Sequence, residues 1–384
     1  MNKTIAVLFG GKSTEHDISI ITALGSIIKP LELSKKYDVL AIYITKDGKW
    51  YCDEKLKDIS LYQTGAIDVF CQKNKPISVV FDGGLTIKTN GLRPKSIKID
   101  VAFPAMHGAY GEDGSLMGLL RMAGIPFVGS DMQASVIAMD KILAKQVAQA
   151  NGILTPRYEF FTKDEFEASR DLIIDKIMKS LIFPMFVKPP HLGSSIGISK
   201  VKNRLELVNA IEVAAHYDDR ILVEESVKNL IEVTVPIIGN DILTVAFPER
   251  PLIGGKKFFD FETKYINGGK KGGSQKANAQ GYSELPANIG DKLLNGSKEV
   301  AQRMYVAAGC EGISRIDLLI DAKTEKIYFN EINPMPGSLY AHNWRAYGIS
   351  NVELVERLVQ LAEDRFVKIS KNQTVFESSF LKQF

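Results

Sequence analysis

One stretch near the end of the chain constrains its fold more than any other. Residues 309–334 form two runs of apolar and β-branched side chains around a short polar segment, which predicts two antiparallel strands joined by a turn. Because side chains of a strand alternate between its two faces, Arg315 and Asp317 point the same way, as do Glu331 and Asn333. Paired strands would therefore collect one guanidinium, two carboxylates and one amide on one patch.

This patch has two interpretations. Carboxylate and amide oxygens are ligands that Mg²⁺ prefers, and a Mg²⁺ ion held by one or two carboxylates usually has phosphate as a further partner. The alternative is a sheet with one solvated polar face. The rigid segment Pro334-Met-Pro336-Gly337 stops the second strand directly beyond the acidic cluster, which favours a binding site.

The composition excludes several classes of protein. A length of 384 residues suggests roughly two or three domains, and 45% hydrophobic with 24% charged residues is typical of a soluble globular protein. A net charge of +3 predicts neither a nucleic-acid partner nor a membrane partner. The three cysteines (Cys52, Cys71 and Cys310) fit free thiols in a reducing compartment. With no signal-peptide core and no apolar run of membrane length, the expected location is the cytoplasm.

Strands and helices alternate in the first part of the chain. The apolar run 4–9, ended by two glycines, predicts a buried parallel strand; a helix over 17–28 and a strand over 37–44 follow. This β-α-β order indicates a doubly wound sheet. Further predicted elements are strands at 99–104, 126–129, 182–189, 221–225, 232–238 and 242–247, and helices at 131–150, 205–215 and 351–364.

Two glycine-containing turns follow buried strands. The first superficially fits a phosphate-loop pattern, which we reject because the residues of the supposed loop are themselves the strand. It instead presents Ser13, Glu15 and His16 at the edge of the sheet where open α/β sheets bind ligands, although Glu15 could merely favour a helix N-terminus. The second, residues 107–114, places three glycines among His107 and two carboxylates. It suggests close backbone approach to a ligand, or a capped helix.

Lysines and a Gly/Ser loop predict contacts to phosphate. Lys188 ends an apolar strand, and the following residues, 191–197, can expose successive N–H groups to an anion as a cover over phosphates. Lys141, on the predicted helix, is either a second phosphate ligand or a solvated side chain. Glu224 and Glu225, which end another strand, could bind an adenine amine or ribose hydroxyls, or could simply be its exposed end.

Other candidates carry less weight. Lys264 and Tyr265 precede residues 267–281, a segment rich in glycine and lysine that is predicted to be a mobile loop. His216 and His342 are interpreted as background. Since no His/Cys cluster has ligand spacing, we predict no zinc site.

Taken together, these residues resemble the D-alanine–D-alanine ligase family of the ATP-grasp superfamily. Six motifs occur in the family's order over nearly the whole chain. They are Phe9-Gly-Gly-Lys-Ser-x-Glu15-His16-x-x-Ser19, His107-Gly-x-x-Gly-Glu-Asp-Gly114, Met139-Asp-Lys141, Val187-Lys-Pro-x-x-x-Gly-Ser-Ser-x-Gly197, Lys264-Tyr265, and Gly312-x-Ser-Arg-x-Asp317 with Asn330-Glu-x-Asn-x-x-Pro-Gly337.

The resemblance implies an α/β (α+β) fold with the three-domain ATP-grasp architecture. An N-terminal doubly wound parallel-sheet domain would span residues 1–127. Two domains with antiparallel sheets, at 128–221 and 222–384, would enclose ATP.

The resemblance also implies a role for each candidate residue. The predicted nucleotide ligands are Lys141, Lys188, Lys264, Ser194 and Ser195 at the phosphates, and Glu224, Glu225, Val227 and Glu232 at the adenosine. The predicted ligands of two Mg²⁺ ions, which Mn²⁺ could replace, are Asp317, Glu331 and Asn333. Glu15 would bind the ammonium of the first substrate, with Ser194, Tyr265 and His107 close by. Arg315 and the backbone at Gly337 would face the oxyanion of the tetrahedral intermediate.

The implied activity is the joining of two D-alanines through an acyl phosphate for cell-wall precursors, by an enzyme expected to be a homodimer. Alternatives are another acceptor, such as D-serine or another small amino or hydroxy acid, and a nucleotide-binding relative without turnover. Tyr265 favours an amine acceptor. This chain departs from the family's pattern at Glu225, in the length of the loop after Tyr265, and in the segment 338–344. The last two departures fall where the acceptor's carboxylate is expected to bind.

Overall fold

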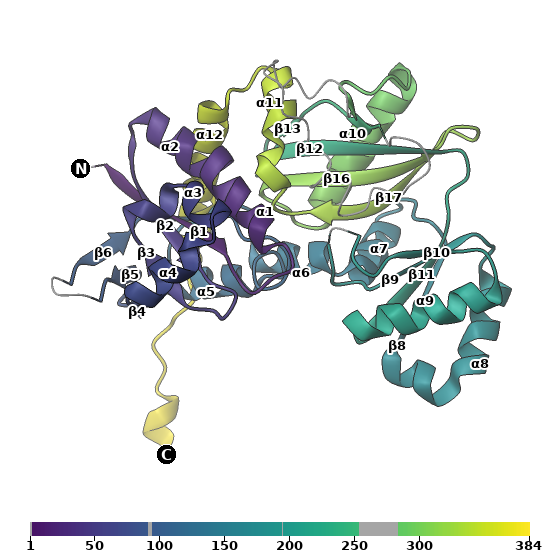
Figure 1. Cartoon of the computed structure of the whole chain (residues 1–384), viewed down its shortest axis with the longest axis horizontal. Helices are drawn as coiled ribbons and strands as arrows, with labels where there is room; N and C mark the ends of the chain where they lie inside the picture. Colours follow the sequence, from purple (N-terminus) through teal and green to yellow (C-terminus); the bar gives the residue numbers. More distant parts are fainter. Residues whose placement is uncertain (1, 91–93, 194, 253–282) are drawn as a thin grey trace.

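The structure is a computed structural model that describes residues 2–90, 94–193, 195–252 and 283–384. Figure 1 shows an N-terminal body on one side and two further sheets, one above the other, on the opposite side. The fold contains both parallel and antiparallel sheets, which confirms the predicted α/β class. The predicted Lys264, Tyr265, Ser194 and the segment 267–281 lie outside the described residues.

The N-terminal body is built on a four-stranded sheet with the order β3-β2-β1-β7. Strand β1 (Lys3–Gly10) pairs in parallel with β2 (Tyr37–Ile44) and with β7 (Val101–Pro104), while β3 (Trp50–Cys52) is antiparallel to β2. Ile5 to Phe9 are fully buried, which explains the unbroken apolar run. The predicted β-α-β start is confirmed.

Short elements complete this body. The connection between β1 and β2 is a continuous helical segment made of α1 (His16–Ile21), the π-helix η1 (Thr22–Ile28) and α2 (Lys29–Ser34), where we predicted one helix. The remaining elements are η2 (Glu54–Lys57), α3 (Ser60–Gln63), α4 (Ala66–Lys73), α5 (Ser115–Ala123) and an antiparallel sheet of β4 (Ser78–Phe81), β5 (Leu85–Lys88) and β6 (Ser96–Ile99).

The helix predicted over 131–150 is two helices, α6 (Met132–Met139) and α7 (Lys141–Ala150). Asp140 between them is extended, and its carboxylate accepts hydrogen bonds from the backbone N–H groups of Ile142 at 2.8 Å and Leu143 at 3.1 Å. The single-helix prediction was wrong because this N-cap competes with continuation of the helix. As a result Lys141 is the first residue of α7 and is buried.

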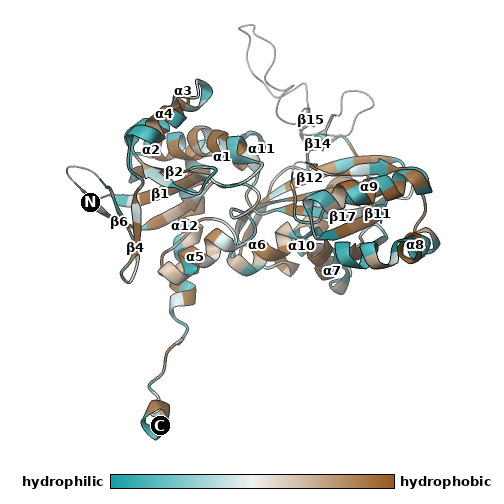
Figure 2. Ribbon diagram, turned by 60° about the horizontal axis from the view of Figure 1, so that its bottom comes forward, coloured by the Kyte–Doolittle hydropathy of each residue, from teal (hydrophilic) through white to brown (hydrophobic). Residues whose placement is uncertain are grey.

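The central sheet is antiparallel, with the order β10-β9-β11-β8. Its strands are β8 (Tyr158–Thr162), β9 (Met185–Lys188), β10 (Ser199–Val201) and β11 (Arg220–Glu225). Helices α8 (Lys163–Ser180) and α9 (Arg204–Tyr217) bury their apolar residues against one face of it. In Figure 2 these helices carry both hydrophilic and hydrophobic residues.

The C-terminal sheet has the order β13-β12-β16-β17 and is also antiparallel. Its strands are β12 (Leu230–Gly239), β13 (Leu243–Val245), β16 (Gly312–Asp321) and β17 (Lys326–Asn333), and α10 (Asp291–Ala307) packs on it. A small ribbon pairs β14 (Arg250–Pro251) with β15 (Ser283–Glu284). The elements after β17 are η4 (Gly337–Tyr340), α11 (Ala341–Tyr347), α12 (Asn351–Ser370) and η5 (Phe380–Gln383).

Helix α12 returns to the N-terminal body, as Figure 1 shows. Leu354, Val355 and Leu358 belong to the same hydrophobic core as Ile27 and Val101. Helix α12 therefore packs the C-terminal part of the chain against the first sheet. In the described part of the chain, every helix is too short or too polar to cross a membrane.

Candidate active site

A cavity of about 660 Å³ lies where the N-terminal turns, the central sheet and the C-terminal sheet meet. Ser13 and His16 do not line it, but its walls include every described residue to which the family resemblance gave a role. These are Glu15, His107, Lys141, Lys188, Ser195, Glu224, Glu225, Val227, Glu232, Arg315, Asp317, Glu331, Asn333 and Gly337. Residues separated by more than 300 positions in the chain thus line the same cavity.

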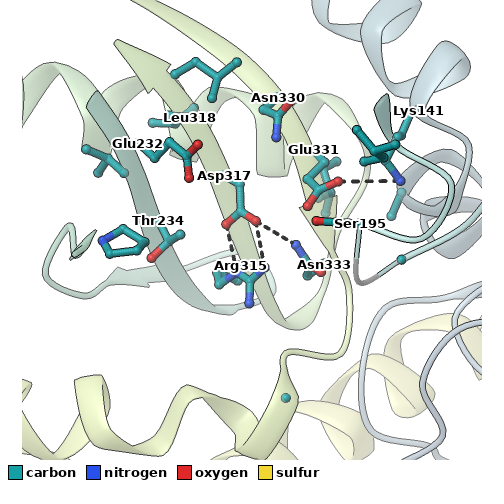
Figure 3. A pocket seen from close by; sticks show the side chains of 18 of the residues that line it. Lys141, Ser195, Glu232, Thr234, Arg315, Asp317, Leu318, Asn330, Glu331 and Asn333 are labelled. Atoms are coloured by element: carbon teal, nitrogen blue, oxygen red, sulfur yellow. Dashed lines mark hydrogen bonds and ion pairs between the residues drawn. The ribbon is translucent and has the colours of Figure 1, made fainter. Parts of the chain in front are cut away.

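Strands β16 and β17 bring together the patch predicted from the sequence. Arg315 lies opposite Asn333 and Asp317 opposite Glu331, with a bulge directly after Asp317. The guanidinium of Arg315 donates two hydrogen bonds to the Asp317 carboxylate, at 2.8 and 2.7 Å, and the Asn333 amide nitrogen donates a third at 3.2 Å (Figure 3). The predicted strand pairing and the shared face are confirmed.

Two buried lysines border this patch. The Lys141 ammonium lies 3.6 Å from a Glu331 oxygen and donates a hydrogen bond of 2.7 Å to the Leu192 carbonyl (Figure 3). Lys188 donates to the Asn330 side chain at 3.3 Å. Because cationic groups stand directly beside the carboxylates, an anionic ligand and a cation can be held next to each other.

Glu224 lies in a buried ion-pair group and is not the exposed end of a strand. Only 1% of it is exposed, and its carboxylate pairs with Lys188 and, at 2.8 Å, with the fully buried Lys145. Burial raises the pKa of Glu224, but the two lysines outweigh burial and hold this pKa at about 2. We did not predict Lys145, although it follows Lys141 by four residues and therefore shares its helical face.

The end of the cavity near α1 holds a second set of carboxylates. Glu15 is buried at the N-cap position of α1, where its side chain makes no capping hydrogen bond. A Cβ atom added to Gly193 would lie 2.7 Å from a Glu15 oxygen, and one added to Gly108 would lie 3.0 Å from it. Glycine in both loops thus permits their close approach to this carboxylate.

Both carboxylates of the turn 107–114 bind backbone N–H groups. Asp113 accepts hydrogen bonds from Tyr110 at 2.8 Å and from Ser115, the first residue of α5, at 2.9 Å. Glu112 instead points inward and accepts from the backbone N–H of Gly108 at 2.7 Å and of Met335 at 3.3 Å. Burial raises the pKa of Glu112 to about 8. The family motif contains this residue, but we had given it no role.

The wall beside Arg315 contains residues that the sequence analysis missed. Tyr340 lies with its ring 5.4 Å from the Arg315 guanidinium, and its hydroxyl is 2.8 Å from that of Thr234. His342, which we had treated as background, lines the cavity, and its Nε2 lies 2.8 Å from the buried carboxylate of Glu249. The background interpretation of His342 was wrong. Its position five residues after Gly337 was the available signal.

Solved structures identify the class of this fold and site. Over 96% of both chains, the structure superposes on the D-alanine–D-alanine ligase from Coxiella burnetii with a TM-score of 0.77 and 27% sequence identity. It also superposes on VanG, a D-Ala:D-Ser ligase from Enterococcus faecalis, with a TM-score of 0.78 and 32% identity over 94% of this chain and 100% of that one. The fold is that of ATP-grasp ligases, as predicted.

Sequence comparisons are more specific. The family profile "D-ala D-ala ligase N-terminus" matches residues 4–130, and "D-ala D-ala ligase C-terminus" matches residues 147–360. The D-alanine–D-alanine ligase of Chloroherpeton thalassium is 39% identical over 371 residues, 95% of this chain and 97% of that relative. That of Acetivibrio thermocellus is 38% identical over 381 residues, 95% and 96% of the two chains. The chain belongs to the D-alanine–D-alanine ligase family.

Proposed function

We propose that this enzyme joins two D-alanine molecules into D-alanyl-D-alanine with ATP as the energy source, releasing ADP and phosphate. The observation that carries the proposal is the pairing of Arg315 and Asp317 with Glu331 and Asn333 inside a cavity that also holds Glu15. In that cavity a substrate ammonium, a metal ion and phosphate groups would each have a complementary side chain.

The donor set fits magnesium and the phosphates of ATP. Asp317, Glu331 and Asn333 offer carboxylate and amide oxygens on one face of the sheet, and hard cations prefer such ligands. Two Mg²⁺ ions, or Mn²⁺ in their place, would be held by these residues and would neutralise charge on the phosphates. Lys141 and Lys188 at the border of this patch would bind phosphate oxygens, together with the loop at Ser195. Glu224, Glu225, Val227 and Glu232 would surround the adenosine.

A carboxylate is a poor acyl donor, so the first D-alanine must be phosphorylated before an amine can attack it. Glu15 would hold its ammonium, with His107 close by, and so aim its carboxylate at the γ-phosphate. The acceptor amine then forms a C–N bond at the carbonyl carbon, and phosphate leaves with the electrons of the broken C–O bond. Arg315 and the backbone N–H at Gly337 would stabilise the oxyanion between these events.

A second candidate acceptor is D-serine. VanG, named as a D-Ala:D-Ser ligase, shares 32% identity with this chain. In addition, the polar pair of Glu249 and His342 stands on the cavity wall beside Tyr340. A hydroxyl on the acceptor would find hydrogen-bonding partners on that wall.

Three further expectations belong to this proposal. The domain boundaries are residues 1–127, 128–221 and 222–384, with α12 packed across onto the first domain. The enzyme works in the cytoplasm, where ATP is available and its three free cysteines stay reduced. It forms a homodimer, as members of the family commonly do, and light scattering of the purified protein would measure its mass.

An acceptor screen tests the proposed reaction. The protein is incubated with ATP, Mg²⁺ and D-alanine, alone or with D-serine, D-lactate or L-alanine, and phosphate and ligated products are measured. We expect phosphate release and D-alanyl-D-alanine with D-alanine alone. Failure to release phosphate with any amino-acid pair would contradict a ligase function, and a mixed product formed in preference would assign the other acceptor.

A further inference from the structure

Directly after Gly337, three consecutive residues with side chains adopt the left-handed backbone region. The φ angles of Ser338, Leu339 and Tyr340 are 51°, 53° and 52°. A residue with a Cβ atom adopts this region rarely, and a run of three persists only where its surroundings hold it in place. Ser338 and Tyr340 line the cavity beside Arg315, so the strained run shapes the site itself.

At the end of this run, Tyr340 contacts Arg315 and Thr234. At its beginning, Ser338 contacts a residue of the N-terminal body. The backbone N–H of Ser338 donates a hydrogen bond of 2.9 Å to the hydroxyl oxygen of Thr22. Thr22 is fully buried and begins the π-helix η1. Single turns of π-helix occur frequently at functional sites, because they place a side chain where an α-helix would not.

The Thr22 hydroxyl has a second partner, the buried His107. It lies 3.0 Å from Nε2 of His107. Burial lowers the pKa of His107 to about 4 against the effect of a hydrogen bond to the Met335 backbone, so the imidazole is neutral at pH 7. The Thr22 hydroxyl oxygen thus accepts a hydrogen bond from Ser338 and lies within hydrogen-bonding distance of the neutral His107 ring.

This chain of bonds connects the two halves of the proposed reaction site. His107 lies at the end of the cavity that contains Glu15, and Ser338 begins the wall next to Arg315. Resting on the ligase function proposed above, we propose that Thr22 is a positioning residue for the acceptor substrate. Its hydroxyl fixes the start of the 338–340 run, and through that run the wall against which the acceptor lies.

The matched pair Thr22→Val and Thr22→Ser tests this proposal. Valine keeps the shape but can neither donate nor accept, whereas serine keeps the hydroxyl. We expect Thr22→Val to raise the KM of the acceptor D-alanine by at least about tenfold, because Ser338 and His107 both lose a buried hydrogen-bond partner. The KM of ATP should change little, and Thr22→Ser should stay close to the wild type.

A partial reaction separates positioning from a general structural role. Hydroxylamine attacks an acyl phosphate without a bound acceptor, forming a hydroxamate as the C–O bond to phosphate breaks. With ATP and D-alanine at low concentration, Thr22→Val should keep hydroxamate formation while dipeptide formation falls. An equal loss in both reactions, or no loss in either, would overturn the role of Thr22. A wild-type enzyme that forms neither product would contradict the proposed function instead.

Discussion

At the scale of single residues, Arg315 is the side chain on which the proposed chemistry depends most. Its guanidinium makes two hydrogen bonds to Asp317 and stacks on Tyr340, so its position is fixed before substrate binds. We expect Arg315→Ala to lower turnover by about 3–4 kcal/mol of transition-state stabilisation, the size of the effect of removing an oxyanion donor. ATP binding should be nearly unchanged in a fluorescence titration.

The matched control for this variant is Arg357→Ala. Arg357 pairs with Glu353 on the exposed surface of α12 and does not line the cavity. That variant should turn over like the wild type. Should Arg315→Ala lose no more activity than Arg357→Ala, the arginine in the cavity would be structural.

The metal assignment is tested with two aspartates of the same strand. Asp317→Asn removes a charge from the patch, so the Mg²⁺ concentration for half-maximal activity should rise by at least about 10-fold. Asp321, at the other end of β16, accepts a hydrogen bond from Asn229 and does not line the cavity, so Asp321→Asn should leave the Mg²⁺ titration unchanged. Identical titrations for the two variants would exclude Asp317 as a ligand.

At the scale of elements, His191 connects the loop after β9 to helix α7. The imidazole lies 3.4 Å from Asp140, the N-cap of that helix, and 3.0 Å from Asp218. Hydrogen bonds to Asp140 and Asp218 raise the pKa of His191 to about 9, against an unfolded value near 6.5. A raised pKa means that the native state binds the proton more tightly, so this stabilisation is complete below pH 6.5 and lost as the pH rises through 9.

Thermal unfolding of the wild type and His191→Gln at several pH values measures this contribution. The wild type should have the higher Tm at pH 6, and the difference should shrink between pH 6.5 and 9.5. A difference that is constant with pH would show that the charge of His191 does not contribute to the stability of this connection.

The sequence predicted those helices and strands that have a clear pattern of apolar residues. It did not predict features that depend on a single capping side chain or on contacts between distant parts of the chain. Strands β1, β2, β16 and β17 follow from continuous or alternating apolar residues, and the alternation alone placed Arg315 and Asp317 on one face. The break at Asp140 depends on one capping side chain within an otherwise helical pattern. Partners such as Glu249 and Thr22 become part of the site only through tertiary contacts, and no local signal marks them. Lys145 had a local signal in its spacing of four residues from Lys141.

At the scale of the whole molecule, α12 holds the C-terminal sheet and the N-terminal body together. Its Arg365 is 4% exposed, donates hydrogen bonds to the carbonyls of Phe127 (2.6 Å) and Gly129, and stacks on the Phe127 ring. Arg365→Ala leaves two buried carbonyls without these donors, which should destabilise the protein by about 3 kcal/mol. Urea unfolding followed by circular dichroism measures this loss, and a change as small as that expected for the exposed Arg357→Ala would contradict the role of α12 as the fastening element.

The whole molecule also explains why three parts of the chain share one cavity. The N-terminal turns supply Glu15 and His107, the central sheet supplies Lys188 and Glu224, and the C-terminal sheet supplies the proposed metal ligands. Contributions from three parts of the chain suit a two-step reaction. Donor, nucleotide and acceptor must bind together in one enclosed space before water can hydrolyse the acyl phosphate.

The most direct test of the central claim follows oxygen atoms through the reaction. If ATP phosphorylates the carboxylate of the first D-alanine, then D-alanine labelled with ¹⁸O in its carboxylate must pass one ¹⁸O atom to phosphate for each dipeptide formed. Mass spectrometry of the released phosphate measures this transfer. We predict one labelled oxygen per phosphate; phosphate without label, formed together with dipeptide, would contradict the acyl-phosphate account.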